Sequence, residues 1–228
     1  MMEFAFSLAV FLLAHMVPTA PPVRARLTTA FGRRGYLLLY SLVSIVLLAW
    51  IIVAARRAPH IPLWDPAPWQ WWGALVLMPF SLLLLLAGLA AVNPLSVSLR
   101  KTRSGFRPSG ITTLTRHPVL WGFGLWALAH IPPNGHLVAV ILFGIMALLA
   151  FAGMRIVDLK AQRRLGSEWH AMAQHSPLIP LATPASRLAL AHLEPRSLLM
   201  GLAAIALYAW FILDGHTRLI GLDPLAGL

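Results

Sequence analysis

Six apolar segments, separated by short polar stretches, constrain this chain more than any other feature. They cover about residues 4–17, 36–55, 71–92, 119–131, 137–156 and 197–213. A helix needs about 20 apolar residues to cross the hydrocarbon core of a bilayer. Of the 228 residues, 59% are hydrophobic and only 11% are charged, which is more apolar surface than a soluble domain of this size buries. The sequence therefore predicts an all-α, polytopic transmembrane helix bundle of about six spans.

We expect a single membrane domain over residues 1–228, with 157–196 as a cytoplasmic amphipathic segment. The first and fourth apolar segments are short, so they would stand upright, thin the bilayer locally or include flanking residues. Within the cytoplasmic segment, residues 160–172 have the pattern of an interfacial helix, with Leu165, Trp169 and Met172 on its apolar side.

The distribution of lysine and arginine predicts the orientation. Fifteen of them lie at the ends of the first, third and fifth apolar segments or in the loops that we expect to follow these segments. Three lie in the loops after the second, fourth and sixth. The fifteen are Arg24, Arg26, Arg33, Arg34, Arg100, Lys101, Arg103, Arg107, Arg116, Arg155, Lys160, Arg163, Arg164, Arg187 and Arg196. By the positive-inside rule, both termini face the periplasm of a bacterial inner membrane. Because anionic lipid headgroups account for the formal charge of +11, we expect the lipid bilayer, and not nucleic acid, as the partner.

Two histidines within the apolar segments are candidate metal ligands. Ionisable residues inside a membrane commonly mark functional sites. His15 lies one helical turn after Phe11, and His130 lies one turn after Trp126. A neutral imidazole in apolar, aromatic surroundings suits axial ligation of a b-type haem. The alternative is that each histidine only bonds a neighbouring helix.

The run Thr115-Arg116-His117-Pro118 opens the fourth apolar segment. Proline suits the first position of a helix. Arg116 and His117 would then lie at a helix N-terminus, where a carboxylate or a haem propionate could bind. The alternative is an ordinary helix start with flanking positive charges.

Several chemistries are excluded or unsupported by the residues present. The chain has no cysteine, which excludes disulfides, thiolate metal ligands and a cysteine nucleophile. It has no glycine-rich phosphate loop and no nucleophilic-serine elbow. Asp158 and Glu168 are ten residues apart on one segment, and this spacing does not indicate an acid–base pair.

Several residues and short runs occur in one order along the chain: His15, Gly32-Arg33-Arg34-Gly35-Tyr36, Asn93-Pro94, Gly110-Ile111, Thr115-Arg116-His117-Pro118, Leu125-Trp126-Ala127-Leu128-Ala129-His130, Asn134-Gly135 and Gly153-Met154-Arg155. In this pattern the chain resembles the NnrU family of bacterial membrane proteins, and also 15-cis-zeta-carotene isomerase of plants and cyanobacteria.

The resemblance implies haem b on His15 and His130. We also expect Arg116, His117 and Trp126 to be cofactor-binding residues. The resemblance also implies a role in nitrite and nitric oxide metabolism (denitrification) or in related membrane redox or isomerase chemistry, with a membrane redox protein or nitrogen-oxide reductase as partner. The isomerase has a cysteine three residues before its second histidine, where this chain has Ala127. Ligand exchange with that cysteine is therefore excluded here.

The predicted topology conflicts with a shared iron. His15 should lie within about one turn of the inner surface, whereas His130 lies about 18 Å from the start of its span. Two axial ligands of one haem lie at nearly the same depth. Either the first span enters the membrane further out than expected, or the helices are staggered, or His15 pairs with His117 and His130 has another role.

Two other functions are open. Arg-His-Pro at a helix start, followed by Asp158 and Glu168, is similar to isoprenylcysteine and phospholipid methyltransferases, which would imply S-adenosylmethionine bound near Arg116, His117, Asp158 and Glu168. The second of these functions is that of a non-catalytic assembly factor for an oxidoreductase. Small residues such as Gly88 would then pack helices together or contact the partner.

Overall fold

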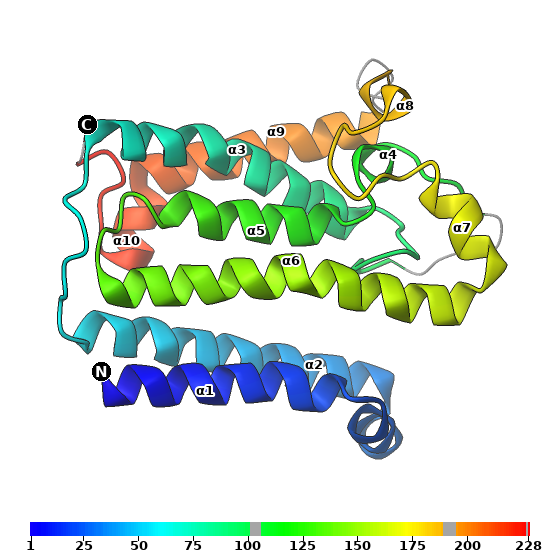
Figure 1. Cartoon of the computed structure of the whole chain (residues 1–228), viewed down its shortest axis with the longest axis horizontal. Coiled ribbons are helices and arrows are strands. Elements are labelled where there is room, and N and C mark those ends of the chain that lie inside the picture. Colours follow the sequence, from blue (N-terminus) through cyan, green and yellow to red (C-terminus); the bar gives the residue numbers. More distant parts are fainter. Residues whose placement is uncertain (101–105, 189–194, 227) are drawn as a thin grey trace. The chain divides into compact units, whose positions relative to one another are not determined.

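The computed structural model describes residues 1–100, 106–188, 195–226 and 228. Over these ranges the chain is helical and contains no β-strand, only an isolated β-bridge between Pro62 and His136. The helices are α1 (Met2–Met16), η1 (Val17–Thr19), α2 (Pro21–Arg57), α3 (Pro68–Ala90), α4 (Ile111–Leu114), α5 (Pro118–His130), α6 (Leu137–Leu165), α7 (Ser167–Ala173), α8 (Pro184–Leu188), α9 (Pro195–Trp210), the π-helical η3 (Phe211–Gly215) and α10 (His216–Ile220) (Figure 1). The all-α prediction is confirmed. Lys101 and Arg103, which contribute to the predicted orientation, lie outside the described residues.

Four helices are long and apolar enough to cross a membrane, as expected for a multi-pass protein. They are α2, α3, α6 and the continuous helix Ser197–Ile220. The two other predicted spans correspond to α1 and α5, which have 15 and 13 residues. α6 continues to Leu165, so the first part of the predicted cytoplasmic segment belongs to this helix.

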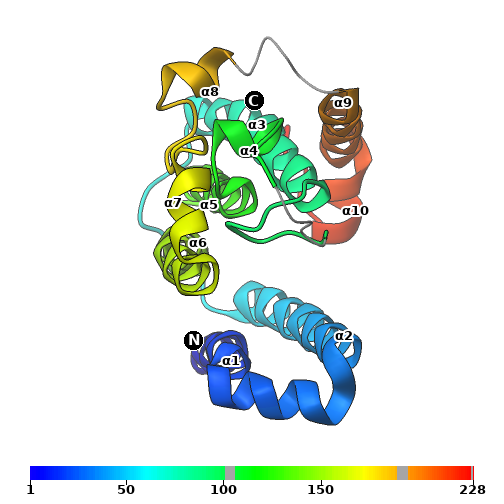
Figure 2. The same ribbon diagram turned by 90° about the vertical axis from the view of Figure 1, so that its right-hand side faces the viewer.

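Two compact units make up the described residues, one from 1–63 with 136–142 and the other from 64–135 with 143–228. The predicted single membrane domain stays a prediction. In the first unit, α1 packs against α2. Gly32 has φ 67°, a left-handed conformation that glycine adopts without steric cost, and it divides α2 into two helical parts. The first part crosses the end of α1, and the second runs back beside α1 (Figures 1 and 2).

The sequence placed Arg24, Arg26, Arg33 and Arg34 in a loop, but the structure has them in α2. All four are exposed. Proline occupies the first helical position at Pro21, and no residue from there to Phe31 opposes a helix. A short basic helix of this kind is typical of the lipid headgroup region.

The second unit is built on close packing between α3 and α5. A Cβ atom on Gly88 would lie 2.9 Å from Cγ2 of Val119, and one on Gly122 would lie 2.8 Å from the Ser81 carbonyl oxygen. The Ser81 hydroxyl donates a 2.8 Å hydrogen bond to the Gly122 carbonyl. Small residues at a helix crossing let two backbones approach in this way. For Gly88, the predicted use in helix packing within the chain is confirmed.

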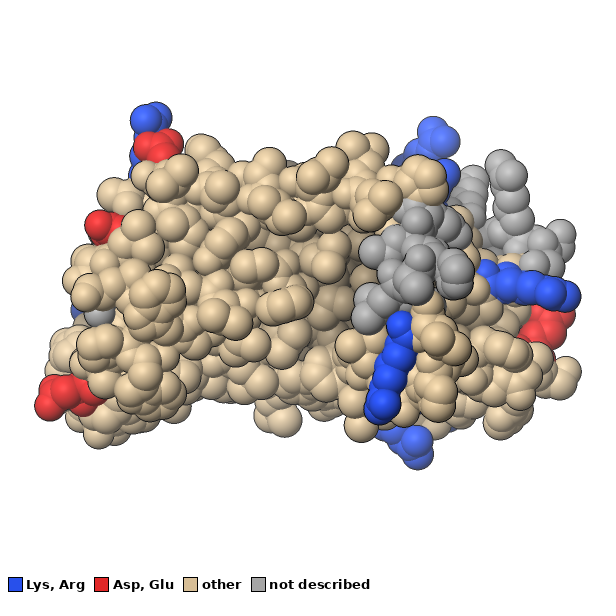
Figure 3. Space-filling view, turned by 90° about the horizontal axis from the view of Figure 1, so that it is seen from above, with Lys and Arg blue, Asp and Glu red and all other residues tan. Residues whose placement is uncertain are grey.

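α9 lies on the other side of α3, where the Tyr208 hydroxyl donates a 2.7 Å hydrogen bond to the Leu75 carbonyl. Figure 2 shows the helices of this unit nearly end-on. Leu202 and Ile205 of α9 are exposed, as expected for residues that face lipid. On the surface over α3 and α9, charged side chains gather toward the ends of the helices and leave the middle uncharged (Figure 3).

Replacing Gly122 by Ala is expected to destabilise the protein by about 1–3 kcal/mol, because backbone atoms of α3 occupy the space of the new methyl group. The added Cβ would lie 2.9 Å from the Leu85 backbone nitrogen as well. Gly144→Ala in α6 is the matched control, since a Cβ there meets nothing within 4 Å. Thermal unfolding in detergent micelles measures both variants. Equal midpoints would contradict the close α3–α5 contact.

Candidate functional site at the start of α5

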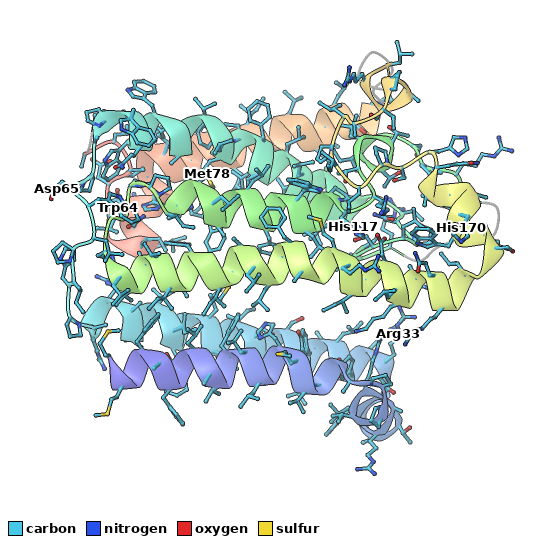
Figure 4. All side chains as sticks on the ribbon, viewed as in Figure 1. Arg33, Trp64, Asp65, Met78, His117 and His170 are labelled. Atoms are coloured by element: carbon cyan, nitrogen blue, oxygen red, sulfur yellow. The ribbon has the colours of Figure 1, made fainter. Side chains whose placement is uncertain are left out.

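The Thr115-Arg116-His117-Pro118 run forms the start of α5, as predicted. Pro118 is the first residue of the helix, and His117 precedes it with φ −121° and ψ 53°. An amide at the first helical position has no hydrogen-bond partner within the helix, so the missing N–H of proline costs nothing there. The fixed φ of proline also suits the first turn. The His117 side chain turns toward Asp158 of α6 (Figure 4). The Arg116 side chain contacts Asp158 as well and also Trp169 of α7.

His117 is fully buried, and both of its ring nitrogens have partners. Nε2 lies 3.0 Å from Oδ1 of Asp158, and Nδ1 lies 2.8 Å from the Ser96 hydroxyl oxygen. An ionised carboxylate only accepts hydrogen bonds. We therefore assign the ring proton to Nε2, which donates to Asp158, while Nδ1 accepts from Ser96. Neither nitrogen is left for a metal ion.

Arg116 forms a bidentate ion pair with the same carboxylate. Its Nη2 donates to Oδ2 of Asp158 at 2.7 Å, and its Nε lies 3.0 Å from both carboxylate oxygens. The two side chains are only 14% and 8% exposed. The guanidinium carbon lies 5.6 Å from the ring centre of Trp169 in α7. This geometry combines a charge-assisted hydrogen bond with a cation–π contact.

Backbone contacts hold the same segment in place. The Arg116 amide donates to the Pro177 carbonyl at 2.9 Å, and the Thr115 hydroxyl donates to the Leu178 carbonyl at 2.8 Å. The Asn93 side-chain amide donates to the Arg116 carbonyl at 2.9 Å. The start of α5 is therefore tied to the chain after α3, to α6 and to the segment after α7.

Burial lowers the pKa of His117 to about 4. Asp158 acts in the opposite direction and favours the protonated ring, but Arg116 opposes it. Because the guanidinium neutralises the carboxylate, the cost of burying a second positive charge decides the outcome. His117 is neutral at pH 7, as the hydrogen-bond assignment requires.

His15 lies at the end of α1, in the first unit. Its Nδ1 is 2.8 Å from the Phe11 carbonyl oxygen, four residues earlier. The ring lies against Phe11, with ring centres 4.0 Å apart, and edge-on to Tyr40 at 5.6 Å. Among the described residues, no hydrogen-bond partner is found for Nε2.

His130 ends α5, in the second unit, and repeats this arrangement. Its Nδ1 is 2.7 Å from the Trp126 carbonyl oxygen, four residues earlier. The ring stacks on Phe143 at 5.0 Å and lies 5.2 Å from the ring of Trp126. Here too, Nε2 has no hydrogen-bond partner in the described part of the chain.

Of the predicted site residues, Arg116 and His117 come together on Asp158, whereas His15 and His130 belong to separate units. Glu168 is exposed on α7 and makes no ion pair among the described residues. Sequence reasoning missed Ser96. It grouped Asp158 with Arg116 and His117 only in the methyltransferase alternative, as part of a cofactor pocket and not as their buried ion-pair partner. Asn93-Pro94 was noted as a pattern, but its hydrogen bond to Arg116 was not foreseen. In the described ranges no group of three or more histidine, aspartate or glutamate side chains is placed to hold a metal ion.

The fold and this cluster define a multi-pass helical membrane protein in which a buried Arg–Asp–His group holds the start of an apolar helix. The chain belongs to the NnrU protein family, whose sequence model matches residues 3–224. No curated protein and no solved structure gives a significant match to it.

Proposed function

We propose that this NnrU family protein is a haem b protein of the bacterial inner membrane, with His15 and His130 as its iron ligands. We further propose that it acts in nitrogen-oxide metabolism, such as nitrite or nitric oxide reduction, with both termini in the periplasm. Haem b would supply one-electron redox chemistry or an iron position for a small ligand. The protein would supply the imidazoles and a water-poor, aromatic setting.

One observation carries this proposal, namely the shared hydrogen-bond pattern of the two histidines. In each, Nδ1 lies within 2.8 Å of the carbonyl oxygen four residues earlier. Histidines that bind a metal commonly donate their other ring N–H to a carbonyl, which fixes the tautomer and the ring orientation. The pattern leaves Nε2 as the ligating atom at both positions.

The same reasoning favours His130 over His117 as a haem ligand. Ligation through His117 would break its bond to Asp158 or to Ser96 inside a buried cluster, which is costly. Among the residues that the structure describes, no such bond involves Nε2 of His130. We therefore propose that Arg116 and His117 hold the start of α5, and that Trp126 packs beside the ligating ring of His130.

The depth of the two histidines decides whether they share an iron. α1 ends one residue after His15, and α5 ends at His130. In the predicted topology α1 runs inward and α5 runs outward, so these residues lie near opposite membrane faces. Two separate haems, each with one histidine from this chain, would satisfy this topology. One shared haem would require staggered helices.

The test is the absorption spectrum of the detergent-purified protein, together with the haem content per chain. We expect a Soret band that falls in His15→Ala and in His130→Ala. Separate haems predict that each variant loses about half of the haem, and a shared haem predicts that each changes the coordination of the whole population. His175→Ala is the matched control, because Nδ1 of this exposed histidine on the segment after α7 makes the same type of bond, to the Ala171 carbonyl at 3.1 Å.

A colourless protein that takes up no haem in vitro would contradict the proposal. So would a Soret band that is unchanged in the double variant His15→Ala/His130→Ala. Circular dichroism and gel filtration confirm that each variant is folded.

A second candidate is a methyltransferase, and the convergence of Arg116, His117 and Asp158 favours it. These residues were expected to form a pocket for S-adenosylmethionine, but they bond one another and His117 is fully buried. The cofactor would have to open the cluster. Titration calorimetry with S-adenosylmethionine tests this candidate, and absence of binding at millimolar concentration would exclude it.

A further inference from the structure

Two histidines outside the proposed haem ligands meet in the first unit. His60 follows the end of α2, and His136 directly precedes α6. Their ring centres are 5.0 Å apart and the ring planes are inclined by 43°. His60 is exposed and His136 is half-buried. Solvent therefore reaches the pair.

The backbone holds this pair together independently of the ring contact. The Leu137 amide donates a 2.9 Å hydrogen bond to the Ile61 carbonyl, and Pro62 forms the isolated β-bridge with His136. Both histidines are thus next to backbone atoms that are fixed against each other. A binding site built on fixed backbone loses less conformational entropy when it takes a ligand.

The spacing of the rings suits one shared metal ion. A metal–nitrogen bond to histidine is about 2.0–2.1 Å long, and two imidazoles on one tetrahedral ion have ring centres about 5 Å apart. Neither ring forms an ion pair with a carboxylate in the described part of the chain. The pair therefore has imidazole donors at ligand spacing that no salt bridge occupies.

We propose that His60 and His136 form a two-histidine binding site for a late first-row divalent cation, such as Zn²⁺, Ni²⁺ or Cu²⁺, with water completing the coordination. Imidazole is a preferred ligand for these ions. The site is separate from the proposed haem ligands, and neither proposal depends on the other. In the predicted orientation it faces the periplasm, where it would meet metal ions outside the cytoplasm.

The ligating atom of His136 is Nε2. Its Nδ1 accepts a long, 3.3 Å hydrogen bond from the Ala139 amide at the start of α6. Binding a metal at Nε2 moves the ring proton to Nδ1 and gives up this contact. Burial and the neighbouring His60 lower the pKa of His136.

Titration calorimetry with ZnCl₂ tests the site, on full-length protein purified in detergent with an affinity tag that contains no histidine. We expect one equivalent to bind with a micromolar dissociation constant. His60→Asn and His136→Asn should each weaken binding at least tenfold. His60→Asn leaves the contact between His136 and Ala139 in place, so it reports on ligation without disturbing α6.

His216→Asn is the matched control, because this half-buried histidine bonds the Leu222 carbonyl at 2.7 Å and lies outside the pair. It should bind as the wild type does. With CuCl₂, electron paramagnetic resonance should show two coupled imidazole nitrogens in the wild type and one in His60→Asn. Wild type that does not bind at millimolar Zn²⁺, or a double variant His60→Asn/His136→Asn that binds as tightly as wild type, would overturn the proposal.

Discussion

Replacing Asp158 by Asn is expected to lower the free energy of unfolding by about 3–5 kcal/mol. The carboxylate accepts hydrogen bonds from Nε and Nη2 of Arg116 and from Nε2 of His117. An amide has no negative charge, so the buried guanidinium loses its counter-ion while still excluded from water. The cost comes mainly from this unpaired charge. Denaturation of the purified protein in detergent micelles measures it.

Two variants separate this explanation from a general loss of packing. Asp214→Asn removes an ion pair of similar length, 2.6 Å to Arg218, that is largely exposed, and it should cost less than about 1 kcal/mol. Arg116→Met combined with Asp158→Leu removes both charges together. This double variant should recover much of the stability that Asp158→Asn loses, because no unpaired charge stays buried. A double variant less stable than Asp158→Asn would contradict the explanation.

Acidification is expected to destabilise the protein by about 3 kcal/mol through His117 alone, since one pKa unit corresponds to about 1.36 kcal/mol. In the folded protein the pKa of His117 is about 4, against 6.5 for a free side chain. Between these pH values the unfolded chain binds a proton that the folded chain does not. The stability that His117 contributes is therefore fully present above pH 6.5 and is lost progressively as the pH falls to about 4.

His117→Gln isolates this contribution, because glutamine does not titrate. Unfolding free energies of the wild type and of His117→Gln are measured between pH 7.5 and 4, and the difference between them is taken at each pH. We expect the advantage of the wild type to shrink as the pH falls. A difference that stays constant over this range would show that His117 is not held neutral by burial.

The sequence predicted the helices well where apolar composition decides them. The segment expected at 71–92 is α3, and α6 begins at Leu137, the first residue of its predicted span. Helix continuation was harder to predict. The arginine-containing stretch before Tyr36 was interpreted as a loop, yet it forms a helix that bends at Gly32. Charge excludes a residue from hydrocarbon, but it does not exclude it from a helix.

The bend at Gly166 shows the same difficulty. A single interfacial helix was predicted over 160–172, but Gly166 adopts φ 57° and separates α6 from α7. Leu165, Trp169 and Met172 nevertheless pack together against Leu95 and Ala161. The periodic pattern therefore identified the buried face correctly, although one left-handed glycine changed the helix that carries it.

For the candidate site, too, the sequence indicated some residues and could not predict the role of others. His15 and His130 could be selected from the sequence as candidate ligands because an imidazole in an apolar segment is rare, and their role stays a proposal. The methyltransferase resemblance grouped Asp158 with Arg116 and His117, but its role as their buried counter-ion could not be predicted, because it lies 42 positions from Arg116. Helical periodicity reports which face a residue occupies, and it does not report which side chain lies across from that face.

By itself the sequence determined that this chain is a helical membrane protein, because hydrophobic burial depends on composition and local pattern. Its ordered motifs also indicated the NnrU family. Only the tertiary structure decided which polar groups satisfy one another. It joined His117 to Asp158 and Ser96 at both ring nitrogens, while His15 and His130 each bond a carbonyl of their own helix through Nδ1. The physical reason is that a hydrogen bond needs two atoms within about 3 Å, and residues distant in the sequence reach that distance only when the helices pack.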